Sequence, residues 1–357
     1  MKILYDHQVF TWQKFGGISR YFFELMRHSS DLFEYDVSGI YSENEYMRQL
    51  VEYKNFPIES SFRGKSRAVG FINKLNSIKK LKQGNYDVFH PTYYDPYALR
   101  YKKNSPMVID VHDMIYEKFP SLFSDADNTI SNKKKFFEKA DVIIATSQNT
   151  KKDLLNIYPN IPENKINVIY RGKIFEAQEK KEKNKCRYIL FTGQRDRYKN
   201  FDKFIQAVAP LLIRYDLQLF CTGSPYTSLE MDLLRKNNIA NRAVCRFMSD
   251  VELQDAYEKA VLFVFPSLYE GFGLPILEAF ASGCPAALSN SSCFPEIAGN
   301  AAIYFDPNSV ESIRKTVEEV LLDNALQSQM IENGYIRLKE FSWDKAARQT
   351  YELYSNI

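Results

Sequence analysis

Residues 266–285 read PSLYEGFGLPILEAFASGCP, and this stretch decides the fold that we expect for the chain. The apolar run VLFVF at 261–265 is typical of a buried strand in a parallel sheet. Residues 274–281 predict a helix, with Pro275 in its first turn, where a missing N–H costs nothing. The stretch therefore predicts a strand, a glycine-containing turn and a helix, which is the repeating unit of α/β proteins.

The turn carries groups suited to a phosphate and a sugar. Gly271 and Gly273 allow the backbone to approach a ligand closely, and a helix start attracts anions. Glu270 and Glu278 are carboxylates that accept hydrogen bonds from sugar hydroxyls. The backbone amides expected to contact phosphate belong to Phe272, Gly273 and Leu274. The alternative is a plain strand–turn–helix unit with surface acids. That alternative accounts poorly for two acids, two glycines and a first-turn proline in one short stretch.

The stretch also resembles the E-x7-E signature of the retaining nucleotide-sugar glycosyltransferases of family 4. The tract EGFGLPILE, the preceding FPS and the following ASGCP all fit that signature. The resemblance implies the GT-B architecture, an α/β fold of two Rossmann-like doubly wound domains that face a cleft. It covers almost the full chain and is strongest over 188–307.

Length and composition agree with a two-domain globular protein. The chain has 357 residues, of which 45% are hydrophobic and 25% charged. A net charge of +3 is too small for a dedicated nucleic-acid binder, so we expect no nucleic-acid partner. The five cysteines are scattered and never spaced C-x-x-C, which argues against a metal site or a disulfide framework and favours a reducing compartment.

The strand–helix pattern is interrupted once, by the charged segment EAQEKKEKNKCR at 176–187, which we interpret as an interdomain linker. Residues 1–175 would form an acceptor-binding Rossmann-like domain and residues 188–341 a nucleotide-sugar-binding one. The resemblance implies that the last helix, 342–357, crosses back to the first domain, with Ser342 placed to cap it.

The first half contains two candidate sites at strand ends. Gly16 and Gly17 form a strand-to-helix turn, which alone is more often an ordinary turn; the resemblance implies that it lines the donor diphosphate and the acceptor. His112 ends a strand, at the edge of the sheet where α/β proteins bind ligands. A lone histidine is more often structural, but the resemblance places this one beside the transferred sugar, so we interpret it as catalytic. Arg171 stands where the family usually has Asn, and its role is left open.

The second half opens with a basic turn, GQRDRYKN at 193–200. Cations at a helix start oppose its macrodipole unless an anion lies between them. The alternative is a surface loop. The resemblance implies instead that Lys199 contacts the donor diphosphate, together with Arg195 or Arg197.

Residues 60–86 contain seven basic residues and no acidic one. Apolar residues recur at helical spacing there, so 62–82 is either a solvated helix packed on its domain or a helix that binds an anionic membrane surface. We see no signal peptide and no apolar run of about 18 residues, so we expect a cytoplasmic protein that is at most peripheral on the inner face of the cell membrane.

We therefore expect a retaining glycosyltransferase that moves a hexose from a UDP-, GDP- or ADP-sugar to a hydroxyl of a sugar or lipid-linked saccharide. The resemblance implies a role in cell-surface polysaccharide assembly, such as O-antigen, capsule or lipopolysaccharide. No metal or other cofactor is expected, because basic side chains take over the charge role of a metal. The alternatives are a GT-B epimerase or phosphorylase and a non-catalytic nucleotide-sugar-binding protein.

Overall fold

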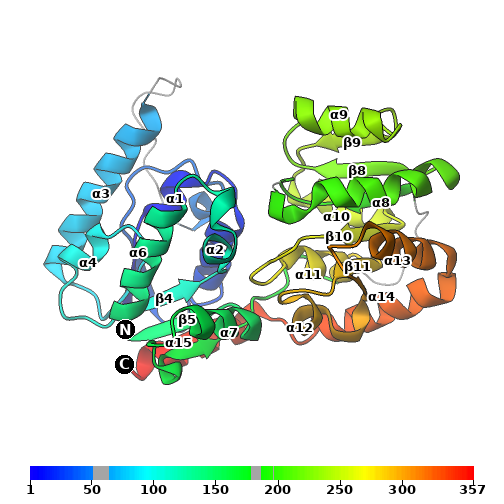
Figure 1. Cartoon of the computed structure of the whole chain (residues 1–357). Helices are drawn as coiled ribbons and strands as arrows, with labels where there is room; N and C mark the ends of the chain where they lie inside the picture. The colour runs from blue at the N-terminus through cyan, green and yellow to red at the C-terminus, as the bar shows by residue number, and fades with distance from the viewer. Residues whose placement is uncertain (51–63, 178–185, 196) are drawn as a thin grey trace. The chain divides into compact units, whose positions relative to one another are not determined.

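The computed structural model describes residues 1–50, 64–177, 186–195 and 197–357 (Figure 1). The chain divides into two compact units: Met1–Gly172 with Ser342–Ile357, and Lys173–Phe341. Most of the segment interpreted as a linker, 178–185, lies outside the described residues. No helix in the described part of the chain is both long and apolar enough to cross a bilayer.

The first unit is an α/β unit whose described strands all pair in parallel. Its strands are β1 (Lys2–Tyr5), β2 (Glu34–Val37), β3 (Val88–His90), β4 (Val108–Val111), β5 (Val142–Ala145) and β6 (Ile166–Val168). Its helices are α1 (Gln8–Trp12), α2 (Gly17–Arg27), α3 (Lys65–Gln83), α4 (Tyr97–Tyr101), α5 (Ile115–Lys118), α6 (Ala126–Lys139), α7 (Gln148–Ile157) and α15 (Trp343–Ser355), with short 3₁₀ turns η1 (Met47–Gln49), η2 (Pro120–Leu122) and η3 (Glu163–Lys165). The strands pair in the orders β2-β1-β3 and β4-β5-β6, and a parallel bridge from Phe89 to Met107 joins the two sets.

The C-terminal helix belongs to the first unit, although the second unit precedes it in the chain. Trp343, Ala346 and Ala347 of α15 are buried in the core that also holds residues of β1 and α2. The side chain of Ser342 accepts a hydrogen bond from the Lys345 amide at 3.4 Å, which confirms the predicted cap.

The second unit is a six-stranded parallel sheet with helices on its faces. Its strands are β7 (Tyr188–Phe191), β8 (Gln218–Thr222), β9 (Ala243–Arg246), β10 (Leu262–Phe265), β11 (Ala286–Ser289) and β12 (Ile303–Phe305). Its helices are α8 (Phe201–Arg214), α9 (Ser228–Lys236), α10 (Asp250–Lys259), α11 (Leu274–Ala281), α12 (Phe294–Ala298), α13 (Val310–Leu322) and α14 (Asn324–Leu338), with 3₁₀ turns η4 (Arg197–Lys199) and η5 (Gly299–Ala301). The expected strand at 261–265 and helix at 274–281 are both present.

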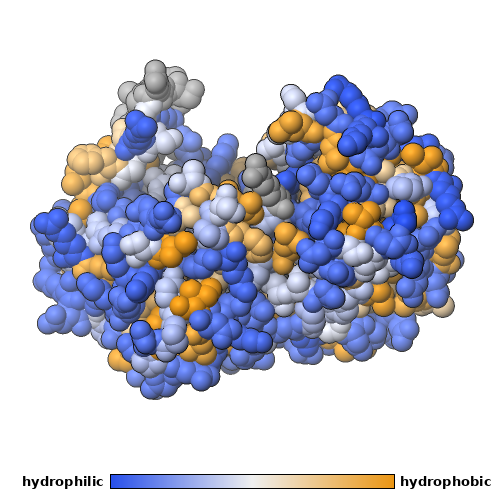
Figure 2. Space-filling model, in the orientation of Figure 1, coloured by the Kyte–Doolittle hydropathy of each residue, from blue (hydrophilic) through white to orange (hydrophobic). Residues whose placement is uncertain are grey.

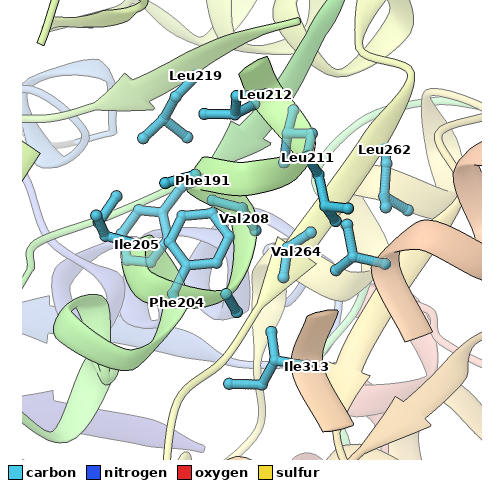
Figure 3. Close-up of a cluster of buried hydrophobic side chains, with 14 of the residues drawn as sticks. Phe191, Phe204, Ile205, Val208, Leu211, Leu212, Leu219, Leu262, Val264 and Ile313 are labelled. Carbon is cyan, nitrogen blue, oxygen red and sulfur yellow. The ribbon is translucent and has the colours of Figure 1, made fainter. Parts of the chain in front are cut away.

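The core of this unit lies under α8 and α13 (Figure 3). Phe204 and Val208 of α8 pack toward Val264 of β10, and Ile313 of α13 lies in the same cluster. All four residues of β10 are buried, because helices cover both faces of a parallel sheet. This packing explains why the strand reads as an unbroken apolar run.

The strand order locates the site. The sheet runs β12-β11-β10-β7-β8-β9, which is the order of two mononucleotide-binding halves meeting between β7 and β10. At such a reversal the loops leave the two strands on opposite sides, and a crevice opens at their carboxyl ends. The loops after β7 and β10 carry the basic turn and the sequence EGFG.

Candidate functional site

Lys199 and Glu270 meet at the reversal of strand order in the second unit. The Leu268 amide donates to the Tyr198 carbonyl at 2.8 Å, which joins the loop after β10 to the loop after β7. Beside this contact, Lys199 Nζ lies 2.6 Å from Glu270 Oε1. The two side chains are 14% and 13% exposed. Two residues 71 positions apart in sequence therefore form one largely buried ion pair.

Three polar side chains hold the loop that carries Glu270. Asn200, with φ of 59°, donates to the carbonyls of Pro266 at 3.2 Å and Pro307 at 2.7 Å. Ser291 Oγ donates to the Leu268 carbonyl at 3.0 Å. Ser292 Oγ accepts from the Glu270 amide at 3.1 Å, and it also contacts the carbonyl of the same residue.

Our sequence analysis did not assign these supporting residues to the site. A signal was present: the polar residues 290–292, NSS, directly follow β11, the strand beside β10. The carboxyl ends of neighbouring parallel strands meet at one edge of a sheet. The polar turn after β11 therefore had to lie beside the loop after β10.

Gly273 lets the chain enter α11. Its φ of +85° is in the left-handed region, and a Cβ there would lie 3.1 Å from Ile276 Cδ1 and 3.3 Å from Phe294 Cε1. Phe272 and Leu274 on either side are buried, while Gly271 completes the turn. Glycine adopts this bend without strain, and α11, with the partial positive charge of its N-terminus, begins four residues after Glu270.

Glu278 is buried one turn into α11 and has an identified partner. The Tyr257 hydroxyl donates to Glu278 Oε2 at 3.0 Å and lies 3.1 Å from Thr192 Oγ1, at the end of β7. Burial, followed by the negative charge of Glu278, raises the pKa of Tyr257 well above its usual value. Tyr257 thus remains a hydrogen-bond donor that orients this carboxylate. No local sequence pattern pointed to this role.

Arg195 is engaged away from Lys199. Its Nε donates to Glu230 Oε1 at 2.7 Å, and one terminal nitrogen, Nη2, donates to the carbonyls of both Ser224 and Pro225 at 2.6 and 3.1 Å. The guanidinium also lies 4.8 Å from the centre of the Tyr226 ring. In this arrangement Arg195 fastens the loop after β8. Its expected contact with diphosphate stays a prediction, and the side chain of Arg197 lies outside the described residues.

In the first unit, Gly16 and Gly17 lead into α2. A Cβ on Gly16 would overlap Gln13 Oε1, whereas one on Gly17 would meet nothing within 4 Å. Gln13 Oε1 accepts a hydrogen bond from the Ser19 amide at 3.1 Å, in the first turn of α2. Gly16 therefore makes room for an amide side chain that caps the helix. Its expected contact with a ligand stays a prediction.

His112 follows β4 and is held by Arg171. An Arg171 terminal nitrogen lies 2.7 Å from His112 Nδ1. Burial, followed by the positive charge of Arg171, lowers the pKa of His112 to about 3. A guanidinium only donates hydrogen bonds, so Nδ1 is the acceptor and the neutral ring carries its proton on Nε2. His112 is thereby prepared to donate a hydrogen bond.

The His112 pair rests on a buried polar network. The Arg171 guanidinium lies 5.1 Å from the centre of the Tyr21 ring, and the Tyr21 hydroxyl donates to Asp110 Oδ1 at 2.7 Å. The other Asp110 oxygen is 2.8 Å from His90 Nε2. Burial opposes ionisation of Asp110, but the charges and hydrogen bonds of His90, His112 and Tyr21 together outweigh it, so the pKa of that carboxyl is lowered.

Two protein families account for most of the chain. The family model of glycosyl transferases group 1 matches residues 173–337, and that of glycosyltransferase family 4 matches residues 15–172. The Escherichia coli O-antigen chain mannosyltransferase B is 33% identical over 174 residues, covering 47% of this chain and 45% of that protein. The E. coli serotype-specific mannosyltransferase WbdA is 29% identical over 244 residues, covering 63% of this chain and 30% of that protein. The matches thus span less than half the length of either relative.

The fold has solved counterparts. Anabaena HepE, in complex with UDP and glucose, superposes with a TM-score of 0.76 and 16% identity over 100% of both chains. At this identity the likeness shows the fold alone, and the fold is GT-B, as the sequence predicts.

Proposed function

The chain belongs to the group 1 and family 4 glycosyltransferases, and from this premise we propose that it transfers a hexose from a nucleotide diphosphate sugar to a hydroxyl of a saccharide. The observation that carries the proposal is the Lys199–Glu270 ion pair beside the start of α11. It supplies a cation for a diphosphate and a carboxylate for a sugar at the reversal of strand order, where α/β sheets bind ligands.

The proposed reaction breaks the bond between the sugar C1 and the diphosphate oxygen and forms one from C1 to the acceptor oxygen. The acceptor proton passes to the departing phosphate, and the configuration at C1 is retained. Negative charge grows on the diphosphate, and Lys199 and the N-terminus of α11 stabilise it. Lys199 supplies the charge that a metal ion would otherwise supply.

The remaining residues position the donor and the sugar. Glu270 turns from Lys199 to the hydroxyls of the transferred sugar when the diphosphate neutralises the lysine. Glu278, held by Tyr257, accepts hydrogen bonds from the ribose hydroxyls. His112, neutral and protonated at Nε2, donates a hydrogen bond to the sugar rather than a proton.

We infer the donor and acceptor from the relatives. Two relatives are named mannosyltransferases and one is named for the O-antigen chain, which favours a mannosyl donor and a cell-surface polysaccharide. HepE binds UDP, so UDP-sugars should be tested as donors beside GDP- and ADP-sugars.

The test is release of nucleoside diphosphate from UDP-, GDP- and ADP-sugars, measured with and without pooled saccharide acceptors. We expect release that depends on one donor and rises with acceptor, and a product whose anomeric configuration by NMR equals that of the donor. An inverted product would refute retention, and a sugar interconverted without acceptor would indicate an epimerase. Donor binding by calorimetry with no turnover would indicate a binding protein.

We also propose that α3 attaches the protein to the cytoplasmic face of a membrane, where a lipid-linked acceptor would lie. Asn73, Ser77 and Leu81 form the buried face of this helix. Phe71 and Leu75 are 63% and 51% exposed, and Figure 2 shows apolar surface over α3.

The burial of Asn73 has a structural cause. Asn73 Oδ1 accepts from the Ile40 and Tyr41 amides at 2.8 and 3.0 Å, so the polar side chain is needed inside. An outward phenylalanine and leucine beside exposed basic residues such as Lys79 match the interface of an anionic bilayer. Residues 62 and 63 of the expected segment lie outside the described residues.

Sedimentation with vesicles tests the membrane proposal. We expect binding to vesicles containing phosphatidylglycerol and weaker binding to pure phosphatidylcholine vesicles. The double variant Phe71→Ser/Leu75→Ser should lose this binding. Leu229→Ser, at an 83% exposed leucine of α9, is the control and should keep it. Equal sedimentation of the double variant and the wild type would refute the proposal.

A further inference from the structure

The first unit contains a groove of about 790 Å³ that the proposed chemistry does not use. It is lined by the end of α1, the loop after β3 and one face of α6. Its volume lies within the range of about 300–1,000 Å³ that is usual for small-molecule sites. All of its lining residues belong to the first unit, so the groove exists within one compact body.

One wall of the groove is aromatic. Trp12 at the end of α1 is 54% exposed, and its ring meets that of Tyr93 edge to face at 5.1 Å between centroids. Val9 and Tyr94 add buried apolar surface at the base. A large exposed indole, fixed by a second ring, offers a rigid flat surface for the C–H face of a sugar ring.

The opposite wall is polar and follows one face of α6. Asp125, Asn128, Asn132 and Lys135 recur at intervals of three and four residues, so they form a row along the helix. Amide and carboxylate groups both accept hydrogen bonds, and amides also donate them, which suits hydroxyls that do both. A row of about ten residues of helix extends about 15 Å, longer than a single sugar ring.

The charge of the lining limits the ligand. Asp95 and Asp125 contribute two carboxylates and Lys135 one ammonium, and Asp95 is already paired with Lys74 at 2.9 Å. Among the described residues that line the groove there is no arginine, the residue best suited to bind carboxylate or phosphate. The groove therefore offers little to an anionic ligand.

We propose that this groove binds neutral hexose residues of the saccharide acceptor, with Trp12 as the stacking surface and the α6 row as hydrogen-bonding partners. Only the identification of the bound saccharide as the acceptor rests on the proposed function. The binding of saccharide in the groove does not depend on it. Gln13 lines the groove and caps α2 beside Gly16, so one end of the groove adjoins the glycine turn. The acceptor chain thus lies in the groove, and its end that receives the sugar lies at that turn.

The composition of the chain allows a direct test. It has two tryptophans, Trp12 in the groove and Trp343, which is 4% exposed in the core. Titration of the full chain with a neutral mannotriose should change the tryptophan emission saturably. Trp12→Phe should abolish that change. A trisaccharide that contains glucuronic acid should bind at least about tenfold more weakly.

Acceptor kinetics provide the matched comparison. Trp12→Ala should raise the KM for a mannotriose acceptor about tenfold, with kcat nearly unchanged. Phe15→Ala, at a 63% exposed aromatic residue outside the groove lining, should leave that KM unchanged. Asn132→Ala, on the other wall, should weaken mannotriose binding even if the Trp12 variants fold poorly.

The outcomes separate the two proposals. An emission change that survives Trp12→Phe, or no saturable change with any neutral oligosaccharide, would overturn the groove assignment even if the protein releases nucleoside diphosphate. Saccharide binding that requires Trp12 and Asn132 would support the groove, even if no donor were turned over.

Discussion

Replacing Lys199 by alanine should remove activity far more than stability. In the structure Lys199 Nζ lies 2.6 Å from Glu270 Oε1. At an effective dielectric constant of about 20, such a contact is worth about 6 kcal/mol of gross Coulomb energy. Desolvation of the two largely buried charges offsets most of this energy.

The stability loss follows from the partner left behind. An exposed pair contributes up to about 1 kcal/mol, and breaking a fully buried pair costs about 3–5 kcal/mol. Because both side chains are about one-seventh exposed, we expect Lys199→Ala to lose about 2–3 kcal/mol of unfolding free energy. For a unit of this size, the midpoint of thermal unfolding should fall by about 5–10 °C.

The activity loss has a separate origin. Removing one group that stabilises developing negative charge lowers kcat by about 10²–10³. The double variant Lys199→Met/Glu270→Gln separates the two effects, because it leaves no uncompensated charge. It should recover most of the stability and none of the activity.

The assay is release of nucleoside diphosphate, run beside thermal unfolding followed by circular dichroism. Lys203→Ala is the matched control, since Lys203 lies four residues after Lys199, in the first turn of α8, and donates to the Asn308 carbonyl at the surface. Lys199→Ala activity within tenfold of the wild type would refute the role of the lysine. Recovery of activity together with stability in the double variant would refute it as well.

Three further predictions follow from single contacts. His112 has a pKa of about 3 in the folded protein and about 6.5 in the unfolded chain, so the unfolded state binds the proton first as the pH falls. The free energy of unfolding should therefore fall between about pH 6.5 and 3, by up to about 1.4 kcal/mol per pH unit. Urea titrations should give a shallower dependence of the unfolding free energy on pH for His112→Gln, and equal slopes would contradict the assignment. Gly273→Ala, at φ of +85°, should lose about 1–2 kcal/mol of unfolding free energy, measured by thermal unfolding, and should bind donor more weakly. Gly70→Ala inside α3, where the nearest contact of the new Cβ is at 3.7 Å, should lose no stability. Equal behaviour of the two variants would be evidence against strain at Gly273. Tyr257→Phe removes the hydroxyl that donates to Glu278, so the donor KM should rise about fivefold with kcat nearly unchanged, and an unchanged KM would show that this hydrogen bond does not orient the carboxylate.

Features that depend on neighbours in the chain were predictable. Ser342 caps α15 through the Lys345 amide, as the sequence predicts. Ser147 at α7 and Ser249 with Glu252 at α10 form caps of the same local kind. The strand, turn and helix around EGFG are also where the pattern places them. Caps and hydrophobic periods are local because a helix satisfies its hydrogen bonds within a few residues.

Features that depend on strand order were only partly predictable. The sequence named Lys199 and Glu270 separately, but their contact at 2.6 Å exists because β7 and β10 are neighbours in the sheet. Arg195 pairs with Glu230 because the neighbouring strands β7 and β8 precede them, and Tyr257 pairs with Glu278 because α10 packs on α11. Neither pair has a local signature in the sequence. In α3, the apolar spacing left open whether the helix packs on its domain or binds a membrane. The structure buries Asn73, which accepts a hydrogen bond from the Ile40 amide, and exposes Phe71 and Leu75.

The sequence by itself thus determined the fold class, the elements around the glycine turn and the residue types able to bind a phosphate and a sugar. Only the tertiary structure decided which of these side chains face one another, which proton His112 keeps, and where a groove opens beside Trp12. The physical reason is range. Backbone hydrogen bonds and side-chain periods act over a few residues, whereas a binding site is assembled where distant strand ends meet.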